Sequence, residues 1–387
     1  MLNAHRFFAC ASALAAALAA ASCSGSAATA GSAPIEDGGL LDAGAADREP
    51  PPPACSAPKT VCGSACVDTS SDTKNCGRCG TGCNGAELCV AGSCTIVAGF
   101  AARKIYLGET DRTGMPVAQA WKAYGRNIDG IISVAGVDNG ECRRIAGASS
   151  SSAADGNNGI DNAWGKTVLG FILGLQPTPT KSTNQLIEGG ARTLMLKFAE
   201  PPKQTGSAPF ALVSAENTFA LKWDGSDSRP IAESSTTGGK PRTVFAVAAM
   251  AGGVLTSGVG SAPFALSFNF GGAALDIPIR LPQVSLKISV DGKTGSEGTI
   301  SGVVDTEEMV ASIEKSAGFI STQLCGGSTL DTIKQVIRQA SDILVDGTQD
   351  PTKDCNAISI GIGFDAVAVA VGPVAGPVGP AKDPCLP

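Results

Sequence analysis

Eight cysteines lie within the forty residues from Cys55 to Cys94, and this density limits the fold of the chain more than any other feature. Forty residues bury too little apolar surface to fold unaided, so cross-links must take the place of a hydrophobic core. Such cysteine density is typical of exported proteins, in which thiols are oxidised to disulfides. We therefore predict a small disulfide-rich module over residues 55–95. Its bonded cysteines are Cys55, Cys62, Cys66, Cys76, Cys79, Cys83, Cys89 and Cys94.

Short motifs surround these cysteines: glycine follows Cys62, Val67-Asp68 follows Cys66, and residues 75–80 read Asn-Cys-Gly-Arg-Cys-Gly. The pattern resembles the cysteine-rich module of plant stigma-specific Stig1-like proteins and looks like a module of secreted myxobacterial proteins. The resemblance implies a small module without enzymatic activity. The spacing of Cys76 and Cys79 also fits a zinc or redox site, but an oxidising compartment favours disulfides. Roughly a hundred pairings are open to eight cysteines, and the sequence selects none.

The first residues have the pattern of an export signal. A weakly basic start precedes an alanine-rich apolar run, which predicts a signal peptide over residues 1–22. Small residues before Cys23 resemble the lipobox of bacterial lipoproteins, which implies acylation of Cys23. By the same resemblance, Ser24 implies an outer-membrane or cell-surface lipoprotein, held to the membrane by its N-terminal lipid anchor. The alternative is cleavage at Ala28-Thr29-Ala30, which would give a secreted protein.

Residues 23–54 form the predicted tether between that anchor and the module. They are rich in Ala, Gly, Ser and Asp, and they end in four prolines that follow Glu49. The segment has neither a helical period nor strand alternation, so it cannot bury a core. We expect a disordered linker that holds the folded parts away from a membrane.

The chain has one histidine, His5, and it lies inside the predicted signal peptide. A mature protein without histidine cannot use a Ser-His-Asp or Cys-His mechanism, nor a histidine-ligated zinc ion. The net charge of −6 comes without clusters of Lys and Arg, which argues against a nucleic-acid partner. Most hydrolase classes and nucleic-acid binding are therefore not expected.

Residues 96–387 show the alternation of a β-rich domain, and the high glycine content of 49 residues fits many turns. Clear alternation occurs at 194–198, 264–270 and 275–281. In the last of these segments Pro278 lies on the face opposite to the apolar residues. Because proline cannot donate to a strand ladder, we expect an edge strand there.

Two local irregularities and one repeat are also visible. The apolar face changes at Pro282-Gln283 and again at Asp365-Ala366, and each change predicts a bulge or bend. Residues 206–212 recur without change as residues 260–266. We expect each copy to lead into a strand, and the two strands to occupy similar places in one sandwich.

Two helices are well signalled. Asp305 opens a capping box, and Gly318 is expected to end the helix that follows. Ser328 opens a longer helix with an apolar stripe, which Gly347 is expected to end. Shorter helices are predicted at 116–124 and 164–175. The resulting fold class is α+β: a β-rich, sandwich-like domain with a few packed helices, preceded by the module and the linker.

Four cysteines remain in the large domain, and an even number predicts two disulfides. They are Cys142, Cys325, Cys355 and Cys385. Cys325 and Cys355 flank the longer helix, so we favour a bond between these two.

The loop at 155–162 is the candidate metal site. Oxygen side chains of Asp155, Asn157 and Asp161 alternate within a glycine-rich stretch, as in loops that bind Ca²⁺. Gly159 replaces one expected ligand, and the alternative is a plain polar turn. Residues that would complete the site are Asp129, Asp138 and Glu141. Calcium is the one cofactor that the sequence indicates.

Paired carboxylates would allow glycoside hydrolysis without histidine. The candidates are Asp111, Asp129, Asp138, Glu141, Asp224 and Asp227. Nothing in the sequence pairs any two of them, and the tryptophans Trp121, Trp164 and Trp223 are expected in the core. The sequence therefore favours a non-catalytic surface protein with an unknown protein or glycan ligand, or a structural role. The alternative is a histidine-independent carbohydrate-acting enzyme.

Overall fold

This computed structural model describes residues 55–70, 72, 74–83, 88–90, 92–95, 98–149, 154–270, 273–320, 322–377 and 385. The predicted signal peptide at 1–22, the linker at 23–54 and Cys23 lie outside the described residues. In the described part of the chain, no helix has the length and apolar character needed to cross a membrane.

The module is held together by disulfides. Its strands form two antiparallel hairpins, β1 (Thr60–Cys62) with β2 (Ala65–Val67) and β3 (Leu88–Val90) with β4 (Ser93–Thr95). Among its described side chains only Cys76 and Cys89 are buried, at 3% and 7% exposure. Sulfur atoms thus take the place of an apolar core. The disulfides join Cys55 to Cys66, Cys62 to Cys79, Cys76 to Cys89 and Cys83 to Cys94.

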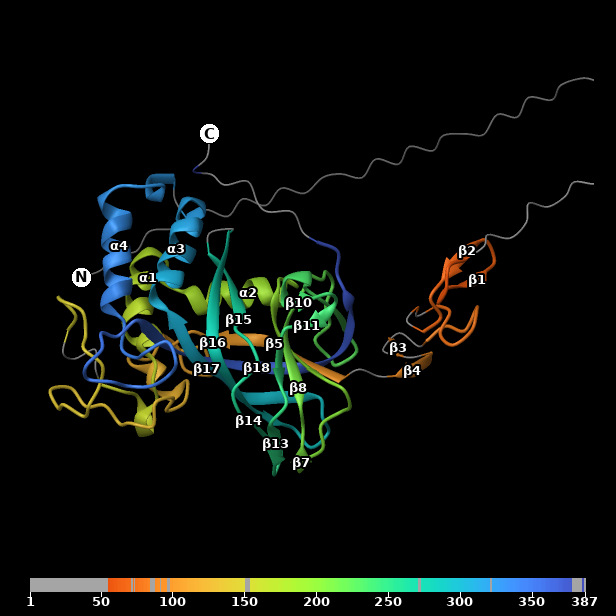
Figure 1. The fold of residues 1–387 in the computed structure, drawn as a ribbon, viewed down its shortest axis with the longest axis horizontal. Helices are drawn as coiled ribbons and strands as arrows, with labels where there is room; N and C mark the ends of the chain where they lie inside the picture. The colour runs from red at the N-terminus through yellow and green to blue at the C-terminus, as the bar shows by residue number, and fades with distance from the viewer. Residues whose placement is uncertain are drawn as a thin grey trace, which may run out of the picture. The chain divides into compact units, whose positions relative to one another are not determined.

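The large domain is built on one twelve-stranded sheet (Figure 1). Its main path runs through β12 (Thr243–Phe245), β8 (Phe210–Ala215), β6 (Thr193–Phe198), β5 (Ala98–Tyr106), β18 (Ala357–Val374), β17 (Thr294–Asp305), β16 (Ala273–Ile288), β14 (Val254–Ser257), β13 (Ala248–Ala251) and β7 (Gly206–Ser207). Off this path, β15 (Phe264–Phe270) pairs with β16, and β9 (Ser228–Ile231) pairs with β18 and β8. A separate hairpin pairs β10 (Thr236–Thr237) with β11 (Lys240–Pro241).

The two ends of this sheet come together. β12 and β13 follow each other closely in the chain, as do β7 and β8, although each pair lies at opposite ends of the strand order. The segment between β14 and β15 bonds to both sides: the amide of Ser261 donates to the carbonyl of Val244 in β12 at 2.9 Å, and the amide of Gly260 donates to the carbonyl of Pro282 in β16 at 2.8 Å. The curled sheet encloses one main hydrophobic cluster. A mostly β-sheet domain with a few helices agrees with the predicted α+β class.

The predicted irregularities of the strands are confirmed. The pairing of β16 with β17 shifts register between Arg280 and Gln283. The pairing of β18 with β5 shifts between Asp365 and Ala366. Over residues 273–279, β16 pairs with β15 on one side only, as expected for an edge that carries a proline.

Both copies of the repeated heptapeptide lead into strands. Phe210 opens β8 and Phe264 opens β15, and each side chain is buried. The two strands are not equivalent, however, because β8 lies between β6 and β12 whereas β15 pairs with β16 alone. The repeat therefore predicts the local structure and the burial of the phenylalanines, but not the place of each strand in the sheet.

The two signalled helices are α3 (Thr306–Ile320) and α4 (Ser328–Gln339). Asp305 caps α3, since its Oδ1 accepts the next amides at 3.0 and 3.1 Å. α3 continues past Gly318, and α4 ends well before Gly347. Leu344 is buried in the loop beyond α4, so the apolar stripe in the sequence mixes helical residues with buried loop residues.

The shorter helices differ more from expectation. Residues 116–124 contain only the 3₁₀ turn Ala120–Ala123. Residues 164–175 begin as a π-helical turn, Trp164–Val168, and continue as α1 (Leu169–Leu175). The helix α2 (Pro179–Glu188), which the sequence analysis missed, packs against β5 and β15. α3 packs against α4, and α4 contacts the π-helical turn that precedes α1 (Figure 1).

The favoured disulfide Cys325–Cys355 is wrong. The structure joins Cys142 to Cys355 and Cys325 to Cys385. Cys325 lies just before α4 (Ser328–Gln339), whereas Cys355 follows α4 only after a long loop and the start of another segment. Cys355 instead returns to the segment of Cys142, where its amide donates to the carbonyl of Arg143 at 2.9 Å.

Candidate functional site

A cavity of about 580 Å³ lies between the segment 108–121 and the helical segment 165–181. We call it the main cavity. Its volume falls within the roughly 300–1,000 Å³ that is common for small-molecule sites. The lining residues that matter most for chemistry are Val117, Trp121, Lys166, Leu169, Leu173 and Lys181.

Glycines let the two walls of the main cavity approach each other. A Cβ atom at Gly165 would lie 2.6 Å from the Cβ of Trp121. One at Gly108, where φ is +128°, would lie 3.0 Å from that same atom and 3.2 Å from Leu169. Both distances are shorter than ordinary contacts, so side chains at these positions would push the walls apart.

The side chain of Asn162 holds both walls to the central strand β18. It is 2% exposed. Its Nδ2 lies within hydrogen-bonding distance of three carbonyl oxygens, those of Trp121 (3.2 Å), Tyr124 (3.0 Å) and Gly361 (2.9 Å). Its Oδ1 accepts the amides of Gly165 (2.9 Å) and Gly361 (3.1 Å). One buried amide therefore satisfies backbone groups from three separate segments.

Lys166 places a cation against the aromatic ring of the cavity. Its Nζ donates to the carbonyl of Ala154 at 2.6 Å and lies 5.3 Å from the centre of the Trp121 ring. The ammonium of Lys122 lies 5.7 Å from the same ring. Burial, and then the positive charge of Arg144, lower the pKa of Lys166 to about 8.

Glu109 is the one acidic residue among those that line the main cavity, and its carboxylate is committed to the fold. Oε1 accepts the amide of Thr180 at 2.7 Å, and Oε2 accepts the hydroxyl of Thr180 at 2.8 Å. These bonds cap the start of α2, where the side chain of Thr178 makes no capping bond. Lys181, in the first turn of α2, is exposed at the cavity.

A smaller cavity of about 200 Å³ is lined by polar residues, and its charged groups are already paired. Arg192 contacts Glu216 at 2.6 Å, and Asp276 accepts the hydroxyl of Ser267 at 2.5 Å. Arg242 donates to the carbonyl of Ser234. The volume of this smaller cavity is below the usual range for a ligand site.

Two of the predicted calcium ligands accept backbone amides within their own region of the chain. Oδ2 of Asp155 accepts the amide of Ser133 at 2.6 Å, and Oδ2 of Asp161 accepts the amide of Ile128 at 2.5 Å. Asn157 is exposed on a 3₁₀ turn. Two of the three residues therefore already hold backbone amides in place, as polar side chains of turns commonly do.

Several carboxyl groups in and near this loop have raised pKa values. Burial, followed by repulsion from Asp129, raises the pKa of Asp161 to about 9. Burial also raises the pKa of Asp155 to about 6 and raises that of Asp342. Of the residues suggested to complete the site, Asp129 accepts the Nε2 of Gln349 at 2.7 Å. Calcium binding at this loop stays a prediction.

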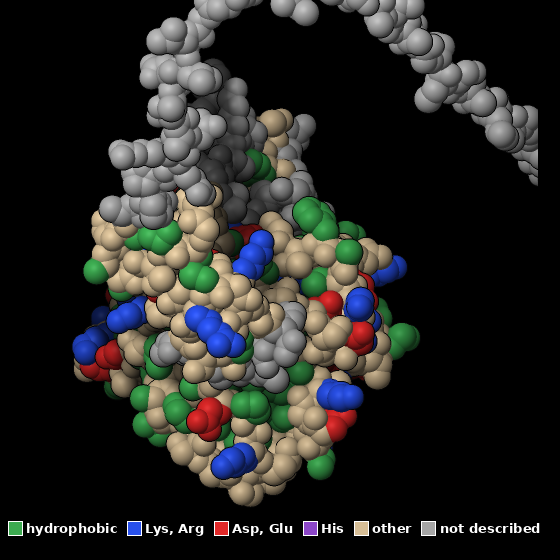
Figure 2. Space-filling model, turned by 90° about the vertical axis from the view of Figure 1, so that its right-hand side faces the viewer, with side chains coloured by type: hydrophobic (Ala, Val, Ile, Leu, Met, Phe, Trp, Pro, Cys, Tyr) green, Lys and Arg blue, Asp and Glu red, His purple; other side chains and the backbone are tan. Residues whose placement is uncertain are grey.

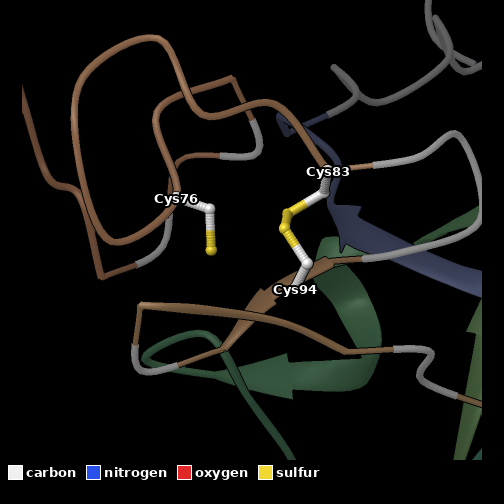
Figure 3. A group of neighbouring side chains, drawn as sticks. All are labelled: Cys76, Cys83 and Cys94. Atoms are coloured by element: carbon white, nitrogen blue, oxygen red, sulfur yellow. A yellow bond between two sulfur atoms is a disulfide. The ribbon is translucent and has the colours of Figure 1, made fainter.

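Three sulfurs of the module form the one group of potential metal ligands that the described residues bring within 4.8 Å of one another. They belong to Cys76, Cys83 and Cys94 (Figure 3). Cys83 and Cys94 are bonded to each other, and Cys76 is bonded to Cys89. Metals bind thiolates, so this group is no metal site while its disulfides are intact.

None of the six carboxylates proposed for catalysis lines the main or the smaller cavity. Asp111 and Asp224 are in exposed turns, where each accepts hydrogen bonds from the residue two positions later. Asp227 is 9% exposed and accepts the amides of Lys222 and Trp223. These roles are structural.

The charges on the face drawn in Figure 2 are mixed, with Lys and Arg interspersed among Asp and Glu. Nucleic-acid binding needs a basic patch or stripe. The expectation that the chain has no nucleic-acid partner stays a prediction.

The main cavity was not predicted from the sequence. Trp164 and Trp223 are buried in the core as expected, but Trp121 also lines the cavity. The available signal was the glycine spacing of the predicted helix at 164–175, because Gly165 and Gly170 both face the cavity. A wall of small residues beside a tryptophan leaves room for a ligand.

Comparisons with known proteins identify the module and not the cavity. Residues 52–97 match the model of the stigma-specific STIG1-like protein family. This stretch, with its four disulfides, is similar to that family, as its cysteine motifs indicate, and it fits an exported protein. No curated protein and no solved structure matches the chain.

Replacement of Asn162 by Ala should lower the free energy of unfolding by at least about 3 kcal/mol, because several buried backbone groups lose their partner. Denaturant unfolding measures this change. Asn157→Ala, on an exposed turn of the same loop, should stay within about 0.5 kcal/mol of the parent protein. Equal effects of the two substitutions would contradict the role given to Asn162.

The calcium hypothesis predicts that Ca²⁺ raises the melting temperature and that a chelator reverses the rise. The rise should grow as the pH increases toward about 9, since the ion must displace the proton that burial keeps on Asp161. Asp161→Asn should remove the effect, whereas Asp224→Asn, in an exposed turn, should keep it. An unchanged melting temperature at every pH would reject calcium binding.

Proposed function

We propose that this chain is an exported, lipid-anchored surface protein whose large domain binds a small, mainly apolar ligand without transforming it. The observation that carries the proposal is the main cavity, which is the larger of the two cavities described and has apolar walls. Val117, Leu169 and Leu173 supply apolar contact, and Trp121 supplies an aromatic edge.

The walls of the main cavity are fixed before any ligand arrives. Asn162 ties Trp121 and Gly165 to the same strand, so both walls rest on one rigid element. A site that is already formed loses little conformational entropy on binding. This supports a binding role for the main cavity over a role as a packing defect.

The same residues give little support to catalysis. Glycoside hydrolysis needs two carboxylates roughly 5–10 Å apart beside the substrate. The main cavity offers Glu109, whose two oxygens are both bonded to Thr180. The carbohydrate-acting enzyme therefore remains the less supported alternative. A protein or glycan partner is likewise less supported than a small ligand that fits this volume.

Export and anchoring form the other half of the proposal. The disulfides of the module and the large domain need an oxidising compartment, which supports export. An acyl group on Cys23 would then hold the protein at the outer membrane or cell surface through its linker.

Replacement of Cys23 by Ala should abolish the incorporation of labelled palmitate and release the protein from the membrane fraction. Cys10→Ala, which changes a cysteine inside the predicted signal peptide, should leave both unchanged. Palmitate labelling that survives in the Cys23→Ala variant would contradict the anchor.

The binding role is tested by filling the main cavity from α1. Gly170 lines the cavity, Gly174 does not, and an added Cβ would meet no atom within 4 Å at either position. Gly170→Leu should therefore weaken binding of the neutral dye N-phenyl-1-naphthylamine about tenfold or more, while Gly174→Leu should retain it. Fluorescence titration gives both affinities.

Both variants should be at least as stable as the parent protein, because leucine favours a helix more than glycine does. Loss of dye binding in the Gly170→Leu variant would then reflect a filled cavity and not unfolding. Equal affinities in the two variants, or no saturable binding by the parent protein, would overturn the proposed function.

A further inference from the structure

We propose that the ligand of the main cavity is a neutral alcohol: a small apolar molecule whose hydroxyl group bonds to the side chain of Thr110. This inference rests on the proposed function and adds the chemical class of the ligand. The observation behind it is a buried hydroxyl of a lining residue that has no hydrogen-bond partner.

Thr110 lines the main cavity and is 7% exposed. Its Oγ1 is buried and has no hydrogen-bond partner among the described residues. No other residue in the described lining of this cavity has a buried side-chain nitrogen or oxygen without a partner. Buried hydroxyls are nearly always paired, because an unmade hydrogen bond lowers stability. The exception at Thr110 points to a partner that enters the cavity from outside.

The backbone of Thr110 is held in place on two sides. It forms an antiparallel bridge with Pro116, and its carbonyl accepts the hydroxyl of the buried Tyr124 at 2.9 Å. The turn between Thr110 and Pro116 is closed by Asp111, whose amide donates to the carbonyl of Met115 at 2.9 Å. These bonds fix the position of the residue, whereas rotation about χ1 between staggered positions changes the direction of its hydroxyl. The hydroxyl can therefore turn toward a molecule in the cavity while the wall stays in place.

The surroundings of Thr110 favour a neutral partner. A charged group that leaves water for this cavity loses its hydration, and one hydroxyl compensates for little of that loss. The lining also carries charges of both signs, Glu109 on one wall and Lys166 and Lys181 on the other. A ligand of either charge would meet a like charge there, and a neutral ligand meets neither penalty.

Among neutral groups, a hydroxyl matches the side chain of Thr110 most fully. The threonine hydroxyl can donate one hydrogen bond and can also accept. An alcohol has the same two capacities, so the two groups can pair in either direction, whereas a carbonyl oxygen can only accept. The rest of the ligand meets apolar side chains, those of Val117, Leu169 and Leu173. An analogue without the hydroxyl would leave Thr110 unpaired and would bind less well.

Ligands with one ring system test this inference on the mature protein. Naphthalene is apolar throughout, and 2-naphthol adds one neutral hydroxyl to it. Displacement of N-phenyl-1-naphthylamine, followed by its fluorescence, gives both affinities. We expect 2-naphthol to bind about fivefold more tightly than naphthalene, from one net hydrogen bond. 2-Naphthoate, which has a carboxylate in place of the hydroxyl, should bind at least about fivefold more weakly than 2-naphthol.

Two threonine variants locate the preference. Thr110→Val keeps the shape of the side chain and removes its hydroxyl, so 2-naphthol should lose its advantage over naphthalene. Because an unpaired buried hydroxyl is removed, the melting temperature should rise by about 2–4 °C. Thr193→Val is the matched control, since Thr193 is 3% exposed, its Oγ1 is also buried without a partner, and it lines neither cavity. This control should raise the melting temperature similarly and keep the affinity ratio of the parent protein.

The outcomes separate the two proposals. If the parent protein shows no saturable dye binding, or if neither naphthalene nor 2-naphthol displaces the dye, the proposed function fails and this inference fails with it. If the two bind equally well, if 2-naphthoate binds as tightly as 2-naphthol, or if Thr110→Val keeps the ratio of the parent protein, only the inference of an alcohol is overturned. A lower melting temperature of Thr110→Val would show that the hydroxyl has a partner within the protein, and would likewise overturn only this inference.

Discussion

The buried amide of Asn162 holds together the three segments on which the main cavity depends. It joins the carbonyl of Trp121, the amide of Gly165 and both backbone groups of Gly361 in the central strand. A buried backbone group without a hydrogen-bond partner lowers the stability of the fold by about 1–3 kcal/mol. The side chain of Asn162 therefore stabilises the two walls at their observed separation. The curled sheet supplies the platform, and Asn162 fixes the two walls to it.

Glycines make the same arrangement possible by sterics. A Cβ at Gly361 would lie 2.1 Å from the carbonyl oxygen of Tyr124, so the segment that carries one wall can cross β18 only where β18 has no side chain. Gly165 plays the equivalent part against Trp121. The shape of the main cavity therefore depends on these close approaches between segments, which glycine allows at Gly361 and Gly165.

Local signals in the sequence predicted local structure well. The change of apolar face at Asp365-Ala366 predicted an irregularity because side chains alternate strictly along a strand, and Asp305 predicted the start of α3 because a carboxylate there can accept free amides. Features that depend on distant contacts were not predictable. The pairing of Cys142 with Cys355 spans 213 residues, and nothing near either cysteine indicates the other.

The loop at 155–162 shows the same limit at the level of function. Alternating oxygen side chains are equally suited to a cation and to backbone amides, so the residue types alone do not tell which they bind. In the structure Asp155 and Asp161 accept hydrogen bonds from backbone amides, and Asn162 bonds to the central strand β18. The main cavity needs residues from two segments that the sequence analysis had no reason to bring together.

The central claim is that the main cavity binds a small, mainly apolar ligand. A crystal structure of the mature protein grown with N-phenyl-1-naphthylamine tests it most directly. We expect density for the dye between segments 108–121 and 165–181, with its rings against Leu169 and Leu173. A dye bound elsewhere, with this cavity empty, would contradict the claim.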